Sequence, residues 1–158
     1  MKFSLFQANA MIKTFGLFKV PMLIYAGVSI VELNENRTVV KIPLNWRTKN
    51  HLNSLYFGSL AVGADVAAGL YASLLIKELK KKVHLSFKDF NANFLKRSMS
   101  DTYFVVENNK EVAAFIDRVI AAPGVRQNLP VNVYATTNAN ENGERIADFI
   151  LTLSLKAV

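Results

Sequence analysis

The spacing of hydrophobic and polar positions changes several times along the 158-residue chain, and each change indicates a new element. Residues 4–18 are rich in apolar side chains that are spread too widely for one clean face, which indicates a short helix that Pro21 ends. Residues 28–33 and 38–43 alternate between apolar and polar around the turn-forming segment 34–36. We therefore expect the chain to begin with a helix at about 4–18 and a pair of antiparallel strands.

A long helix is predicted at about residues 56–79, after a polar loop that follows the second strand. One stripe of this helix consists almost entirely of small residues, at helical spacing: Gly58, Ala61, Asp65, Gly69 and Ala72. Between residues 56 and 76 Asp65 is the only charged residue, and placing it at the centre of a bilayer would cost about 2.5–3.5 kcal/mol. The rest of the chain predicts alternating strands that need a core, so we expect this segment to be a buried helix rather than a membrane span. Its small stripe would let another backbone approach closely.

The second half of the chain predicts four more strands and one more helix. Residues 82–98 alternate, with a change of parity near Asp89 that indicates a β-bulge. A strand at 101–108, a helix at about 110–122 and two strands at 129–139 and 145–158 complete the order. Six strands connected mostly by hairpins, with helices set apart on one face, predict a single α+β domain over residues 1–158.

Composition excludes several classes of protein. Hydrophobic residues make up 51% of the chain and charged residues 20%, which excludes a disordered chain. The chain has no cysteine, which excludes disulfides and thiolate ligands and fits a reducing, cytoplasmic location. His51 has no second His, Cys or acid at ligand spacing, so we expect no metal and no cofactor. Lys13 and Lys19 interrupt the apolar N-terminus, which we interpret as mature sequence rather than a signal peptide.

The net charge of +7 leaves several partners open, namely nucleic acid, an anionic membrane or a phosphorylated small molecule, besides a merely solvated surface. The densest basic positions are Lys77, Lys80, Lys81, Lys82, Lys96 and Arg97. They lack the interleaved aromatic residues of a nucleic-acid binder, so we expect no nucleic-acid partner. They could meet the phosphates of coenzyme A or form an ordinary solvated face.

The stretch from Asn50 to Gly69, NHLNSLYFGSLAVGADVAAG, resembles the hotdog-fold thioesterase superfamily, in particular its phenylacetate-pathway thioesterases. Those proteins carry a loop Asn, then His-Gly-Gly at a helix start, then an Asp or Glu seven residues after the second Gly. Gly58 and Asp65 keep this spacing, whereas Tyr56 and Phe57 replace the His and the first Gly. The resemblance implies a hotdog fold, in which an antiparallel six-stranded sheet wraps around a long central helix, and the additional helices resemble a separate subfamily.

The resemblance also implies a function, hydrolysis of an acyl-CoA or acyl-carrier thioester at a subunit interface of a homodimer or homotetramer. Asp65 would act as general base on a water or as nucleophile, and partial desolvation would raise its pKa and make it a better base. The backbone amides at Phe57 and Gly58 would polarise the carbonyl. The implied catalytic residues are Asp65, Asn53 and Gly58, and the implied substrate-binding residues are Asn50, His51, Tyr56 and Phe57.

Other interpretations of the same residues stay open. Asp65 could be a structural carboxylate that accepts hydrogen bonds, and the loop residues Asn50, His51 and Asn53 could serve only to form turns. The replacement at Tyr56-Phe57 favours a second function, a protein that binds an acyl chain or acyl-CoA without hydrolysing it. A third alternative is binding of a basic surface to nucleic acid or membrane, for which affinity would depend strongly on salt.

Overall fold

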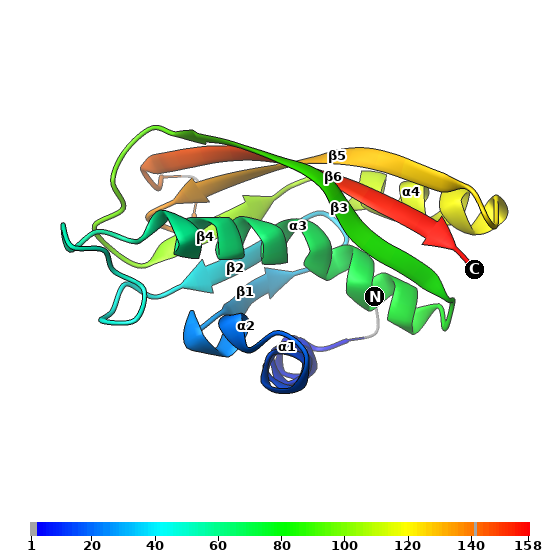
Figure 1. Cartoon of the computed structure of the whole chain (residues 1–158), viewed down its shortest axis with the longest axis horizontal. Coiled ribbons are helices and arrows are strands. Elements are labelled where there is room, and N and C mark those ends of the chain that lie inside the picture. Colours follow the sequence, from blue (N-terminus) through cyan, green and yellow to red (C-terminus); the bar gives the residue numbers. More distant parts are fainter. Residues whose placement is uncertain (1–2, 141) are drawn as a thin grey trace.

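The computed structural model describes residues 3–140 and 142–158, and Figure 1 shows how their helices and strands are arranged. The order agrees with the sequence prediction except for one additional short helix. The elements are α1 (Leu5–Phe18), α2 (Pro21–Tyr25), β1 (Ser29–Leu33), β2 (Thr38–Ile42), α3 (Phe57–Glu78), β3 (Val83–Phe94), β4 (Thr102–Val106), α4 (Asn109–Ala121), β5 (Arg126–Thr136) and β6 (Arg145–Ala157).

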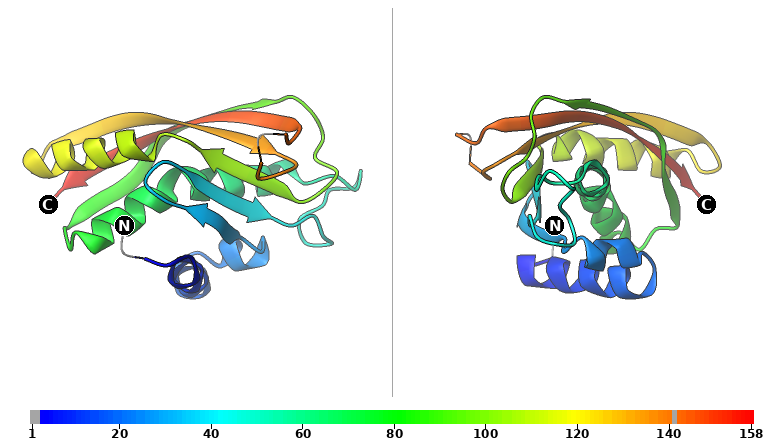
Figure 2. Two further views of the ribbon diagram at one scale, coloured as in Figure 1. Left: turned by 180° about the vertical axis from the view of Figure 1, so that it is seen from behind. Right: turned by 60° about the vertical axis from the view of Figure 1, so that its left-hand side comes forward.

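The six strands form one antiparallel sheet in the order β1-β2-β4-β5-β6-β3. The sheet curves around α3, so that β5 and β6 lie on one side of the helix and β1 and β2 on the other (Figures 1 and 2). This confirms the predicted α+β architecture with a central helix. The register between β3 and β6 shifts between Phe87 and Phe90, which confirms the bulge predicted near Asp89.

The central helix α3 packs closely against the sheet because its inner face carries small residues. Gly63 is the clearest case, since a Cβ atom added there would lie 2.2 Å from a ring carbon of Phe104 on β4. Only glycine fits against that ring without displacing it. α3 is long and apolar enough to cross a bilayer, but most of its surface is buried in the protein, as predicted for a core helix.

The helix α2 corrects the expectation that the chain leaves helical structure at Pro21. Pro21 instead occupies the first turn of a second helix, where a proline lacks only an N–H group that would have no partner anyway. α1 itself begins with a capping box, in which the N–H of Gln7 donates to Ser4 Oγ and the N–H of Ser4 donates to Gln7 Oε1. Proline therefore separates two helices here rather than a helix from a loop.

The side chain of Asn9 attaches α1 to the edge strand β1. Its Nδ2 donates to the carbonyl of Ile30 and its Oδ1 accepts from the N–H of the same residue, both at 2.9 Å. These two hydrogen bonds satisfy backbone groups that face away from the sheet, at the point where β1 bulges. α1 is thereby held beside the sheet, in a layer below α3 in Figure 1.

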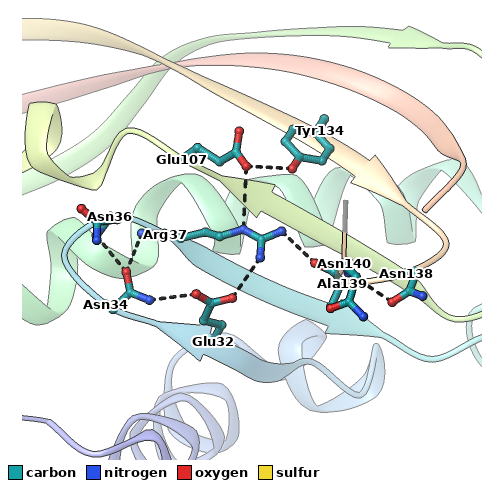
Figure 3. Close-up of polar contacts among 9 residues, drawn as sticks. All are labelled: Glu32, Asn34, Asn36, Arg37, Glu107, Tyr134, Asn138, Ala139 and Asn140. Atoms are coloured by element: carbon teal, nitrogen blue, oxygen red, sulfur yellow. Dashed lines mark hydrogen bonds and ion pairs between the residues drawn. The ribbon is translucent and has the colours of Figure 1, made fainter. Parts of the chain in front are cut away.

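A group of charged and polar side chains, the Arg37 network, connects the β1–β2 turn to β4 and β5 (Figure 3). The guanidinium of Arg37 approaches Glu32 Oε2 at 3.1 Å and Glu107 Oε1 at 3.8 Å, and its Nη2 donates to the carbonyl of Ala139 at 2.7 Å. The hydroxyl of Tyr134 donates to Glu107 at 3.0 Å. The network joins three segments that are distant in sequence and gives each of its charged groups a partner.

Candidate functional site

A groove of about 920 Å³ lies between α1, α3 and β3. Along α3 it is lined by Asp65, Gly69, Ser73 and Lys77, which follow one another at intervals of about one helical turn. The other walls are largely apolar and include Met11, Ile12, Phe15, Phe18, Leu85 and Phe87. An apolar groove with a few polar groups is typical of sites that hold small molecules.

Asp65 lies on the one side of α3 that the sheet leaves uncovered, and it lines this groove. In a single chain the side chain is open to solvent, and no hydrogen bond or ion pair involves it within residues 3–140 and 142–158. Protein around the groove still removes part of its hydration, and this desolvation raises the pKa of Asp65 above the ordinary value of an aspartate. The predicted direction of the pKa shift is therefore confirmed, and the carboxylate is suited to accept a proton.

The start of α3 offers two backbone N–H groups without partners. The N–H groups of Ser59 and Leu60 both donate to the carbonyl of Tyr56, whereas no acceptor for those of Phe57 and Gly58 occurs among the described residues. The Tyr56 ring covers Gly58, because a Cβ atom added there would lie 2.5 Å from Tyr56 Cε1. The exposed rings of Tyr56 and Phe57 contact each other with centroids 4.9 Å apart. The helix start therefore combines free amides with a pair of aromatic side chains.

The loop before α3 is organised by its own asparagines. Asn50 Oδ1 accepts hydrogen bonds from the N–H and the hydroxyl of Ser54, both at 3.2 Å. Asn53 adopts a left-handed backbone conformation, with φ of 57°, and its Oδ1 accepts from Lys49 Nζ at 2.9 Å. His51 is exposed. These contacts are those of the turn-forming interpretation, and the catalytic role of Asn53 and the substrate-binding roles of Asn50 and His51 stay predictions.

The candidate site residues do not converge on one point within a single chain. Gly58 and Asp65 are separated by seven residues, which places them on nearly the same face of α3 but about 10 Å apart along its axis. One thioester carbonyl cannot contact both. The residues predicted to act with Asp65 that do not line the groove are Asn50, His51, Asn53, Tyr56, Phe57 and Gly58.

Sequence reasoning missed the contribution of α1 to the groove. The apolar composition of residues 4–18 predicts a helix, but no local signal indicates that Phe15 and Phe18 lie opposite the Asp65 side of α3. Lys19 and Lys77 also line the groove, and they are the two lysines that the geometry singles out from the basic residues of the chain. Within the described part of the chain, no group of three or more His, Cys, Asp or Glu residues could hold a metal ion.

Residues 8–149 match the sequence profile of a family described as a domain of unknown function, DUF4442. The chain belongs to the DUF4442 family. A search of curated proteins finds no match to this DUF4442 domain.

Solved structures confirm the predicted fold of this DUF4442 domain. A protein of unknown function from Chlorobaculum tepidum superposes with a TM-score of 0.81 at 14% identity, over 97% of this chain and 96% of the other. A thioesterase from Haemophilus influenzae gives 0.70 at 20% identity, over 99% and 93% of the two chains. A thioesterase family protein from Silicibacter pomeroyi gives 0.67 at 18% identity, over 98% and 100%. The DUF4442 domain therefore has the hotdog fold of thioesterase-like proteins, as its sequence resemblance predicted.

Proposed function

We propose that this protein hydrolyses an acyl thioester, with coenzyme A or an acyl carrier as the leaving thiol. The observation that carries the proposal is Asp65, a carboxylate with a raised pKa and no partner among the described residues, on the wall of an apolar groove. The thioesterases that share the fold support the same reaction.

In the proposed reaction Asp65 takes a proton from a water molecule as the water oxygen bonds to the thioester carbonyl carbon. The carbonyl oxygen becomes an oxyanion, and the free amides of Phe57 and Gly58 are suited to stabilise it. When the intermediate collapses, the bond between carbon and sulfur breaks, and the thiolate leaves and takes up a proton. The products are a carboxylic acid and a free thiol. In the nucleophilic form of this reaction, a carboxylate oxygen of Asp65 bonds to the same carbon and the bond to sulfur breaks, which releases the thiolate and leaves a mixed anhydride. Water then hydrolyses the anhydride and regenerates Asp65.

The distance along α3 requires that the amides and the carboxylate come from two copies of the chain. Asp65 and the helix start of one copy lie too far apart to act on one carbonyl, whereas the helix start of a second copy could approach the Asp65 of the first. The strand β3 supports such an assembly, because it is a twelve-residue edge strand with one side unpaired. The proposal therefore includes a homodimer, either alone or paired into a tetramer. It also includes a cytoplasmic location.

Thiol release from a series of acyl-CoAs of increasing chain length, followed with a thiol-reactive dye, tests the proposal. Asp65→Asn keeps the shape of the side chain and should lower kcat by about 10²–10⁴-fold. Asp117→Asn, which makes the same change at an exposed position on α4, is the matched control and should leave kcat unchanged. Full activity of Asp65→Asn, or no thiol release by the wild-type protein from any of these substrates, would contradict the mechanism.

A second candidate function is binding of an acyl chain or acyl-CoA without chemistry. The observation that favours it is the exposed aromatic pair Tyr56-Phe57 beside the free amides, since these rings narrow the approach of a thioester to the helix start. This function predicts that mass spectrometry of the native protein detects a bound lipid while the hydrolysis assay stays silent. If the protein only binds its ligand, the Tyr56→Ala variant would still show no hydrolysis. If the site is active but crowded by the ring, the same variant would hydrolyse its substrate faster than the wild type.

A further inference from the structure

The outward side of α1 and α2 is unusually apolar for a protein surface. Phe6 is 82% exposed, Phe18 73% and Leu17 63%, and Met22 and Tyr25 on α2 are also exposed. We call these five residues the α1–α2 surface. Large apolar side chains gathered on an exposed surface are typical of sites of interaction with a protein or a membrane.

The helix α1, which carries three of the five residues of the α1–α2 surface, is firmly attached to the rest of the protein. α1 buries Ala8, Ile12 and Gly16 against the protein, and Asn9 holds it to β1 through two hydrogen bonds. The apolar residues that remain exposed are therefore additional to those that attach the helix. Figure 2 shows α1 and α2 as a layer on the far side of α3 from β5 and β6, where a flat partner could reach them.

The charge of this layer is of one sign. Residues 3–28 contain Lys13 and Lys19 and no aspartate or glutamate. Lys13 and Lys19 are exposed, and neither forms an ion pair within residues 3–140 and 142–158. Long lysine side chains can lie along apolar surface while their ammonium groups reach the head groups of a bilayer.

We propose that the α1–α2 surface attaches the protein peripherally to bilayers that contain anionic lipids. Apolar and aromatic side chains that enter the boundary between head groups and acyl chains, together with lysines, are the composition of helices that lie on membranes. Anionic lipids attract each nearby lysine. A second copy of the chain fits less well, because a two-fold interface sets the same surface against itself and would bring lysines together without a carboxylate from that layer.

This attachment is independent of hydrolysis, but it has a consequence for the groove. Phe18 and Lys19 belong to the layer and also line the groove that contains Asp65. Attachment to a bilayer would therefore bring the part of the groove lined by Phe18 and Lys19 close to the lipid surface. The attachment can be tested on the full-length protein without any substrate.

The test is sedimentation of the protein with vesicles of phosphatidylcholine alone or mixed with phosphatidylglycerol. We expect binding to the mixed vesicles that weakens as salt shortens the Debye length from about 10 Å at 0.1 M to about 3 Å at 1 M. Phe6→Ser should weaken binding about tenfold, because it removes a side chain that enters the lipid. Lys13→Gln and Lys19→Gln should each weaken it about fivefold. Trp46→Ser, at a 77% exposed position outside the layer, and Lys110→Gln on α4 are matched controls and should change nothing.

Three results would overturn the proposal. The first is the absence of binding to mixed vesicles by the wild-type protein. The second is an equal loss of binding in Phe6→Ser and in Trp46→Ser, which would place the contact elsewhere. The third is a change in oligomeric state, measured by sedimentation velocity, when Phe6 and Leu17 are both replaced by serine, which would make the α1–α2 surface an interface between copies.

Discussion

Two regions of this protein contain charged side chains next to apolar surface, and they differ in whether those charges have partners. In the Arg37 network each charged group has partners, with Arg37 between Glu32 and Glu107 and in contact with a backbone carbonyl (Figure 3). In the groove Asp65 has no hydrogen bond or ion pair among the described residues, and its pKa is raised. The first arrangement stabilises a fold, whereas the second costs free energy and persists where the group has another use.

The comparison shows why burial alone does not identify a functional residue. Asn109 is fully buried on α4, yet its Nδ2 donates to Thr38 Oγ1 at 2.9 Å and to the carbonyl of Asn34 at 2.7 Å. Asp65 is open to solvent in a single chain, yet its carboxylate is partly desolvated and has no hydrogen bond or ion pair among the described residues. What distinguishes Asp65 is the combination of a carboxylate without partners among the described residues and a position on the wall of an apolar groove.

The largest effect that would test this contrast is on stability, in the Arg37 network. Arg37→Met removes the shared partner of two carboxylates and should lower the free energy of unfolding by about 1–2 kcal/mol, after allowing for the solvent exposure of both glutamates. Thermal denaturation should show a midpoint about 3–6 °C lower, with thiol release per folded molecule unchanged. Lys110→Met, the same kind of change on the surface of α4, should leave the midpoint in place. If the network contributed nothing to the free energy of unfolding, both variants would melt at the same midpoint.

The next largest effect should come from narrowing the groove. A Cβ atom at Gly69 would lie 3.3 Å from Phe87 Cζ, so a larger side chain there has to extend into the groove or displace that ring. Gly69→Val should reduce kcat/KM for long acyl chains about tenfold more than for acetyl-CoA, because only a long chain needs this part of the groove. Ala114→Val, at an exposed position on α4 outside the groove lining, is the control. An equal loss on short and long substrates would mean that the acyl chain lies elsewhere.

A smaller effect should distinguish the two groove lysines from the other basic residues. If Lys19 and Lys77 meet the phosphates of coenzyme A, then replacing both by glutamine should raise KM for an acyl-CoA about fivefold and leave kcat unchanged. The same acyl group on pantetheine, which carries no phosphate, should be hydrolysed equally well by the variant and the wild type. The control replaces Lys81 and Lys110, which removes the same charge away from the groove lining. A fivefold rise of KM in that control would instead indicate long-range attraction between the basic protein and the phosphates of coenzyme A.

Much of the fold could be predicted because the signals for α3 and the strands are local. The change of parity near Asp89 lies within one strand and indicated the bulge correctly. The predicted small stripe of α3 instead faces the groove at Asp65 and Gly69, and the glycine that packs against the sheet is Gly63, outside that stripe. Asp65 stands out in the sequence as the one charge between residues 56 and 76 and by its spacing from Gly58, and its role stays a prediction. The Arg37 network could not be predicted, because it joins residues up to 102 positions apart, and neither could the groove, because α1 carries no local sign of the helix it lies beside.

The smallest expected effect is that of Asp65 on how the stability of the protein depends on pH. Because the pKa of Asp65 in the folded protein is raised, the unfolded chain loses this proton first as pH rises, and stability falls from about pH 4 up to the folded pKa and then stays lower. Asp65→Asn removes this penalty, which solvent screening limits to a few tenths of a kcal/mol. At pH 7 the variant should therefore melt about 1–2 °C higher than the wild type, and below about pH 4 the two should melt together. Asp101→Asn should do the opposite at pH 7, since Lys41 and the N–H of Leu44 hold the pKa of Asp101 below its usual value and its charge stabilises the fold. If both variants were less stable at pH 7, the Asp65 carboxylate would have partners after all and would belong with the Arg37 network.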